Sequence, residues 1–362
     1  MPISAVDTIT LAFQHTKRQL FQPFRFGQWT RLAIVGLLAG EAGSNGGFNF
    51  PTNFSMPQQN DSSQQFLSGG WPHIDPAVLG TLILVLVITG LVFGIVMLYV
   101  SSVMRFILFD SVLTRKCLIR EGWSHRQRPA WDYFVWQLGY MVVILAGLAI
   151  LVGIPALYAY SSGWFREPSD HVGALVLSGI LVFCLVFVLF VAAAVVHVFT
   201  KDFVVPQMAL EGIDAIEGWR RLWPMMQKEG TRYAGYFGMK ILLTIGAGIV
   251  VGIVGLIMSL FIAIPALVFS LVAIFAGKAA GLTWNALTIT AAVVAGCIAL
   301  AVLLYVIALI SVPVIVFFPA YAIYFFAARY RPLSLALYPL PASPLSPPPQ
   351  GFPPTGPSPA PA

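Results

Sequence analysis

The sequence predicts an all-α integral membrane protein with about six transmembrane helices, interfacial amphipathic helices on the cytoplasmic side, and a threefold internal repeat of helix-hairpin units. The chain has 362 residues, of which 58% are hydrophobic and only 9% are charged. Soluble domains carry about 25% charged residues. Five runs without Asp, Glu, Lys or Arg each exceed the roughly 20 residues that cross a hydrocarbon core of about 30 Å. These runs are 76–104, 133–165, 172–200, 241–277 and 279–328.

The long runs are predicted to be helices. Backbone groups cannot hydrogen-bond to lipid, so a spanning segment is either a helix or a strand of a closed barrel. A barrel strand alternates apolar and polar residues, whereas LILVLVITGLVFGIVMLYV (82–100) is apolar throughout. Leu32 to Gly40 is shorter and ends at Glu41, so it needs a separate argument.

The basic residues predict the orientation. Eighteen of the twenty Lys and Arg lie in 1–31, 105–132, 200–240 and 329–331, and only Arg166 and Lys278 lie elsewhere. Cytoplasmic loops are enriched in Lys and Arg, so we expect both termini in the cytoplasm and the protein in the cell (plasma or inner) membrane. The number of crossings between 31 and 105 must then be even, which makes 32–50 a span. The net charge of +6 forms no single dense patch, so we expect no nucleic-acid partner.

Two segments predict other structures. The run 241–277 is too long for one crossing, so we expect a span to Ala263, a break at Pro265, and an interfacial remainder. Residues 331–362 are rich in proline and predict a disordered cytoplasmic tail after a membrane domain over 1–330. The polar loop 43–75 contains sequons at Asn53 and Asn60, which arise readily by chance.

A faint internal repeat divides the membrane domain into units of about 1–110, 111–210 and 211–330. The stretch VMRFILFDSVLTRKCLIREGW (103–123) aligns with FTKDFVVPQMALEGIDAIEGW (199–219). Downstream, IPALY (154–158) corresponds to IPALV (264–268), and VPVIVFFPAYAIYFF (312–326) is a third copy of the first half. Each unit would combine a basic aromatic segment, an outgoing span and a returning span.

Three stretches carry a family resemblance: EGWRRLWPMMQKE (217–229), DFVVPQMALEG (202–212) and FRFGQWTRLAIVGLLAG (24–40). They resemble uncharacterised prokaryotic membrane proteins related to the membrane domain of glycerophosphoryl diester phosphodiesterase. In that family the domain sometimes accompanies a soluble barrel that carries the catalysis. This chain has no soluble segment of about 250 residues for such a barrel. The resemblance therefore implies a membrane domain without catalytic residues.

Few ionisable residues lie in the predicted spans, where they would mark functional sites. Glu41 is placed at the outer end of the first span, either as a cation or proton site or, as we favour, as a helix end that reaches water. His197 lies near the inner end of the fourth span, and Asp202 follows one turn later. A local His197–Asp202 pair is an alternative to an ordinary interfacial histidine.

No catalytic, cofactor-binding or metal-binding residues are predicted. His15, His73, His125 and His171 lack metal-ligand spacing. An acidic cluster, followed by Arg220 and Arg221, is compatible with a metal or headgroup site, but better with the solvated face of an interfacial helix. This cluster consists of Glu211, Asp214 and Glu217.

Small-residue spacings predict close helix packing, within the chain rather than between copies. They occur at Gly36/Gly40, Gly90/Gly94 and Gly248/Gly252.

Three functions are compatible with these patterns. The leading hypothesis is a non-enzymatic accessory or scaffold protein associated with membrane lipids, a protein partner or further copies of itself. The alternative is a small-solute or lipid transporter or channel, because internal repeats and proline-broken helices occur in transporters. Against it stands the scarcity of polar groups at mid-membrane. The weakest of the three hypotheses is a membrane-embedded enzyme that acts on lipids through the acidic cluster.

Overall fold

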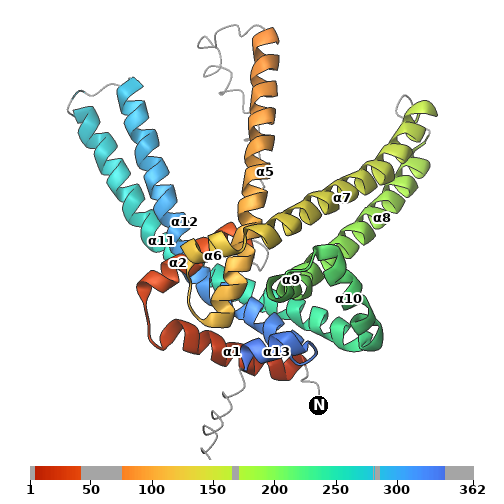
Figure 1. Cartoon of the computed structure of the whole chain (residues 1–362). Coiled ribbons are helices and arrows are strands. Elements are labelled where there is room, and N and C mark those ends of the chain that lie inside the picture. The colour runs from red at the N-terminus through yellow and green to blue at the C-terminus, as the bar shows by residue number, and fades with distance from the viewer. Residues whose placement is uncertain (1–4, 42–75, 165–170, 280, 282–285, 339–362) are drawn as a thin grey trace, which may run out of the picture.

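The computed structural model describes residues 5–41, 76–164, 171–279, 281 and 286–338, and these are all helical apart from short connections. Long helices radiate as three arms from a packed base (Figure 1). We call the outer parts of the long helices the arms: α5, the pair α7 and α8, and the pair α11 and α12. The long helices are α5 (Pro76–Thr114), α7 (Gln127–Ser161), α8 (Val172–Phe199), α11 (Gly230–Ala279) and α12 (Ala286–Ala327).

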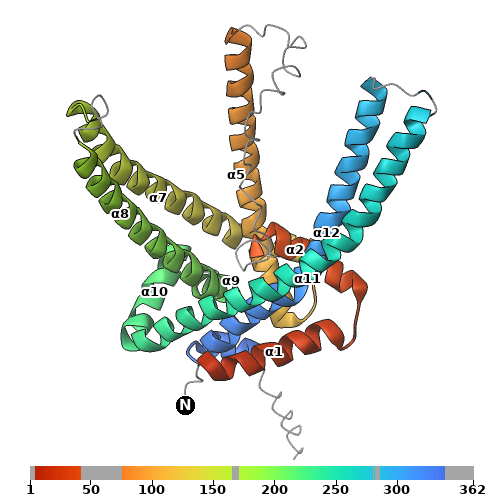
Figure 2. The same cartoon turned by 180° about the vertical axis from the view of Figure 1, so that it is seen from behind.

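The base consists of short helices packed around the inner ends of the long ones, as the opposite view also shows (Figure 2). Helix α1 packs on α12, and α2 packs on both α12 and α5. The short elements are α1 (Ala5–Phe21), α2 (Phe26–Leu38), α6 (Ile119–His125), the π-helix η2 (Thr200–Val204), α9 (Val205–Glu211), α10 (Ala215–Lys228) and α13 (Arg331–Leu337).

Five helices among the described residues are long and apolar enough to cross a membrane. Their apolar side chains are exposed all round, as Leu86 (69%), Leu177 (70%) and Phe261 (72%) illustrate. A helix that is hydrophobic on every face belongs in a large core or in lipid. No such core surrounds the arms in the part of the chain that the structure describes, so the prediction of a multi-pass membrane protein is supported.

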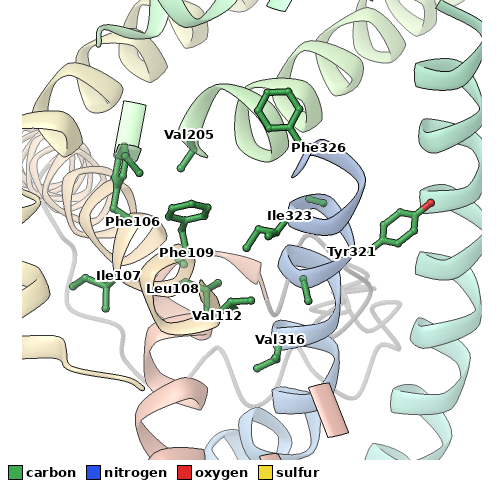
Figure 3. Close-up of a cluster of buried hydrophobic side chains, with 14 of the residues drawn as sticks. Phe106, Ile107, Leu108, Phe109, Val112, Val205, Val316, Tyr321, Ile323 and Phe326 are labelled. Atoms are coloured by element: carbon green, nitrogen blue, oxygen red, sulfur yellow. The ribbon is translucent and has the colours of Figure 1, made fainter. Parts of the chain in front are cut away.

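The hydrophobic core lies in the base, where the inner ends of α5, η2–α9 and α12 converge (Figure 3). Phe106 and Phe109 come from α5, Val205 from α9, and Ile323 from α12. Aromatic rings extend this core toward α11. The ring of Tyr236 stacks on Tyr321 at 5.0 Å, with an interplanar angle of 8°.

The predicted span over 32–50 is not among the five candidate spans. Helix α2 has 13 residues, which is about 20 Å at 1.5 Å per residue and less than the bilayer core. Its Leu32 and Val35 are fully buried in the base. Residues 42–50, the rest of the predicted span, lie outside the described residues.

The predicted break at Pro265 is wrong. Helix α11 continues through this proline from Gly230 to Ala279. Proline is tolerated inside transmembrane helices because neighbouring groups and small local adjustments compensate the lost hydrogen bond. The tail prediction also needs a correction at its start, because α13 is helical from Arg331 to Leu337. Residues 339–362, the loop 43–75 and its sequons lie outside the described residues.

Two arms are antiparallel pairs with a proline inside the outgoing helix, Pro155 in α7 and Pro265 in α11. The units predicted for 111–210 and 211–330 each contain one such pair, but their bounds stay a prediction. The threefold repeat itself stays a prediction.

The glycine spacings have mixed outcomes. A Cβ added at Gly36 would lie 2.4 Å from Cγ2 of Ile315, so α2 approaches α12 closely there. Packing within the chain is not found at Gly90, Gly94 and Gly252, because a Cβ at these positions would meet nothing described within 4 Å, and the alternative of packing between copies stays a prediction there.

We expect Gly36→Ala to destabilise the protein by about 1–3 kcal/mol, because the added methyl group overpacks a fully buried contact with Ile315. Gly90→Ala is the matched control. It adds a methyl group in open space and should be neutral or stabilising by up to about 1 kcal/mol. Thermal unfolding of the two purified variants in one detergent checks the difference. Equal midpoints would contradict the close approach of α2 to α12.

Candidate functional site

A cluster of five charged side chains is buried where the arms enter the base. We call Glu41, Arg105, Lys201, Asp202 and Lys240 the junction cluster. Glu41 is 1% exposed, Arg105 7%, Asp202 4% and Lys240 5%, and the Lys201 side chain is 7% exposed. Charged residues are almost never this buried unless they are paired. The cluster is therefore the strongest candidate for a functional site within the described part of the chain.

The π-helix η2 carries two members of the cluster side by side. It spans Thr200–Val204 between α8 and α9 and is followed by Pro206. Proline removes a backbone donor and clashes with the carbonyl four residues earlier, which here belongs to Asp202. A wider turn before the proline relieves this conflict, and π-turns often occur at functional sites. Lys201 and Asp202 thereby face different partners.

Each residue of the η2 pair forms a buried ion pair with a distant segment. Lys201 donates to Glu41, which lies just beyond the end of α2. Asp202 accepts from Lys240 of α11 and also from the hydroxyl of Tyr236, at 2.9 Å. The two pairs connect the end of α2, η2 and α11.

Arg105 of α5 completes the cluster with neutral partners. Its Nη2 donates to the carbonyl of Ala39 at 3.1 Å, and its Nη1 donates to the hydroxyl of Tyr133 on α7. The guanidinium carbon also lies 5.4 Å from the centre of the Tyr133 ring, a cation–π distance. Its Nε is buried without a hydrogen-bond partner among the described residues.

The charges of the junction cluster do not cancel. Arg105, Lys201 and Lys240 are three cations against two carboxylates, which leaves one positive charge in excess. A cavity of about 30 Å³ is lined by four of the five residues and has room for about one water molecule. The arrangement can hold helices together and attract an anion.

The predicted position of Glu41 is wrong. It lies in the junction cluster at the base and not at the outer end of a span. The reason is that α2 ends inside the base, where the ammonium of Lys201 neutralises the carboxylate.

The alternative of a local His197–Asp202 pair is not what the structure shows. No hydrogen bond joins these two residues in the described chain, because Asp202 binds Lys240 and Tyr236 instead. His197 is half-buried and lines a groove between α8 and α11 together with Lys201 and Lys240.

Two of the three residues in the acidic cluster, Glu211 and Glu217, form ion pairs with arginine. Glu217 accepts from Arg221 at 3.0 Å and pairs with Arg220 at 3.5 Å, which are the i, i+4 and i, i+3 pairs of a solvated helix face. Glu211 pairs with Arg221 and accepts from Tyr330. Burial and this hydrogen bond raise the pKa of Tyr330. Asp214 precedes α10 and forms no side-chain cap.

The remaining histidines lie apart from the cluster. His15 of α1 is buried, with Nδ1 3.1 Å from the Tyr324 hydroxyl and Nε2 3.0 Å from the Val112 carbonyl. Burial and the nearby charge of Arg115 lower the pKa of His15. Over the described residues, no group of three or more His, Cys, Asp or Glu side chains is arranged to hold a metal ion. His73 lies outside the described residues.

A family model matches residues 3–336, which is most of the chain. The chain belongs to the family of unknown function DUF7544. The DUF7544 match begins before α1 and ends within α13, so the base and all three arms fall inside one family unit. No curated protein and no solved structure matches the chain.

Sequence reasoning missed Arg105, Lys201 and Lys240 as site residues of this DUF7544 chain. All three flank apolar runs, so their pattern is the same as that of a cytoplasmic anchor at the membrane surface. The available signal was that Glu41 directly follows a short apolar stretch and that Asp202 lies two residues after the run 172–200.

Proposed function

We propose that this DUF7544 protein is a non-enzymatic scaffold of the cell (plasma or inner) membrane, with its base in the cytoplasm and its arms among lipids and partner membrane proteins. One observation carries the proposal. The most apolar window of each candidate span is 6% buried or less, so the arms make little contact with one another. The exposed apolar surfaces of the arms are therefore available to lipid tails and to helices of other proteins.

The base explains how such an open arrangement is held. Ion pairs between buried partners join α2, η2 and α11, and Arg105 joins α5 to α7. Bidentate binding of Asp110 by Arg126, at 2.7 and 2.8 Å, ties the chain between α5 and α7 back to α5. Arms fixed at one end present partner-binding surfaces in a constant geometry, as a scaffold requires.

The resemblance to the membrane domain of glycerophosphoryl diester phosphodiesterase supports a non-enzymatic role. In that family the membrane domain sometimes accompanies a separate soluble barrel, and that barrel carries the catalysis. Here two of the three acidic side chains that a membrane-embedded enzyme would use, Glu211 and Glu217, are engaged by Arg221 and Tyr330. The cytoplasmic placement of the base rests on the basic residues, which gather on the same side of every candidate span.

Photo-crosslinking tests the scaffold. A crosslinking residue is placed at Leu86 of α5, at Leu177 of α8, or at Phe261 of α11, all at least 69% exposed. The matched control is Arg220 on α10, whose side chain is 82% exposed in the base. We expect the arm positions to capture membrane proteins or lipids, and Arg220 to capture cytoplasmic proteins only. Mass spectrometry after purification in native nanodiscs identifies the products.

The scaffold is contradicted if the arm positions enrich no specific protein or lipid over an untagged membrane. The orientation is contradicted if Arg220 captures proteins from the opposite side of the membrane.

A lipid transporter is the second candidate. The groove lined by His197, Lys201 and Lys240 lies beside exposed apolar residues and favours this reading. The uncharged outer parts of the spans weigh against transport of ions. A scrambling assay in proteoliposomes distinguishes the two: a scaffold gives no lipid flux above that of empty vesicles.

A further inference from the structure

A groove lies between α8 and α11, just outside the junction cluster. These helices meet through Phe199 and Phe237, whose ring centres are 6.1 Å apart, and their outer parts then belong to different arms. The groove has a volume of about 360 Å³. We call it the α8–α11 groove. It is lined by Ala194, His197, Val198, Lys201, Phe237, Lys240, Ile241, Thr244 and Ile245.

The inner half of this groove is basic. His197, Lys201 and Lys240 line it, and no acidic side chain is among its described lining residues. The carboxylates that pair with the two lysines, Glu41 and Asp202, line the central cavity instead. An ammonium has three N–H donors, and the ion pair of Lys240 with Asp202 uses one of them. The ammonium of Lys240 therefore keeps donors for a ligand in the groove, whereas the excess cation of the junction cluster is Arg105, which lines the central cavity.

The outer half of the groove is apolar and open to the surroundings of the arms. Ile241 is 46% exposed and Ile245 is 56% exposed, and Ala194 faces them from α8. The hydroxyl of Thr244 is occupied, since it donates to the carbonyl of Lys240 at 2.8 Å. The groove is therefore complementary to an amphiphile. Its basic inner half suits a negatively charged head group, and its apolar outer half suits a hydrocarbon chain.

We propose that the α8–α11 groove binds an anionic phospholipid of the cytoplasmic leaflet, with the phosphate at Lys240 and His197 and an acyl chain along Ala194 and Ile245. This inference deepens the scaffold proposal and depends on its placement of the base in the cytoplasm. Basic pockets between transmembrane helices on the cytoplasmic side are suited to anionic head groups. A free phosphate ion would leave the apolar half of the groove unused.

Lipid retention tests the proposal. The full chain is reconstituted in nanodiscs with equal amounts of phosphatidylglycerol and phosphatidylcholine, extracted into mild detergent, and examined by native mass spectrometry. Ala194→Trp fills the apolar half without changing any charge. Ala192→Trp is the matched control, because Ala192 is an exposed alanine on the same helix that does not line the groove. Lys240→Gln combined with Asp202→Asn removes one cation and one anion together, and Lys240→Arg keeps the cation.

We expect the wild type, Ala192→Trp and Lys240→Arg to retain phosphatidylglycerol in preference to phosphatidylcholine. Ala194→Trp and the Lys240→Gln/Asp202→Asn variant should bind it about tenfold more weakly, a change of ~1.4 kcal/mol. Equal retention of both lipids by the wild type overturns the proposal, as does equal retention by the two tryptophan variants. Thermal unfolding identifies a variant that fails to fold, and Ala194→Trp then decides alone because its site is exposed.

The two proposals fail separately. Selective phosphatidylglycerol retention without arm crosslinks to membrane proteins keeps the lipid site and limits the scaffold to lipids. Arm crosslinks to proteins without selective retention keep the scaffold and remove the lipid site.

Discussion

Asp202→Leu is expected to lower the free energy of unfolding by about 3–5 kcal/mol, because it leaves the ammonium of Lys240 buried without its carboxylate. The hydroxyl of Tyr236 loses its acceptor as well. Lys240→Met should have a similar effect, since it strands the carboxylate instead. Both single substitutions break the contact that joins η2 to α11.

The double variant Asp202→Leu/Lys240→Met distinguishes the loss of the ion pair from the change in side-chain packing. Replacement of both charges by apolar side chains of similar volume is often close to neutral. We expect the double variant to lose less than either single variant, with a residual cost for the Tyr236 hydroxyl of about 1–3 kcal/mol. Chemical unfolding in mixed micelles gives all four values of the cycle. Additive losses would show that the two side chains act independently.

Glu41→Gln is the second substitution with a large expected effect, about 3–5 kcal/mol, because the Lys201 ammonium keeps its burial and loses its counter-charge. The matched control is Glu217→Gln on α10. The same chemical change there affects pairs with Arg220 and Arg221, whose side chains are 82% and 40% exposed, so it should cost less than about 1 kcal/mol.

The same unfolding assay compares the two glutamine variants. Lys201→Met in the Glu41→Gln background should recover much of the lost stability. Similar losses at Glu41 and Glu217, or no recovery by Lys201→Met, would mean that Glu41 does not anchor the end of α2 to η2.

The arms could be predicted from sequence because their cause is local. A run such as 82–100 has no charge and no alternation, and in lipid only a helix satisfies its backbone. The exposed pairs of α10 were predictable for the same reason, since Glu217 and Arg221 lie one turn apart. The path through Pro265 was not, because proline both kinks and ends helices, and the outcome depends on neighbours outside the local sequence.

The junction cluster could not be predicted because its pairs are long-range. Glu41 and Lys201 are 160 positions apart, and Asp202 and Lys240 are 38 apart. A lysine that flanks an apolar run looks the same in sequence whether it reaches lipid phosphates or a buried carboxylate. For Lys201, the position of α2 decides whether the lysine reaches lipid phosphates or a buried carboxylate. That position could not be predicted, because a short apolar run that ends in a glutamate is compatible with a span or with a buried helix. The sign of the charges was readable, but their partners were not.

The single wide turn at η2 has a consequence for rotational register. A π-turn contains one residue more than an α-turn, and one residue corresponds to about 100° around a helix axis. Loss of one residue from Thr200–Val204 would therefore rotate α9 by about that angle relative to α8. Met208, which is fully buried, would turn away from its neighbours, and the carbonyl of Ala209 would leave Arg126, whose Nη1 now lies 2.5 Å away. The one extra residue in the π-turn thus sets the rotation of α9 relative to α8, and with it the contacts that the inner end of the α7 and α8 arm makes in the base.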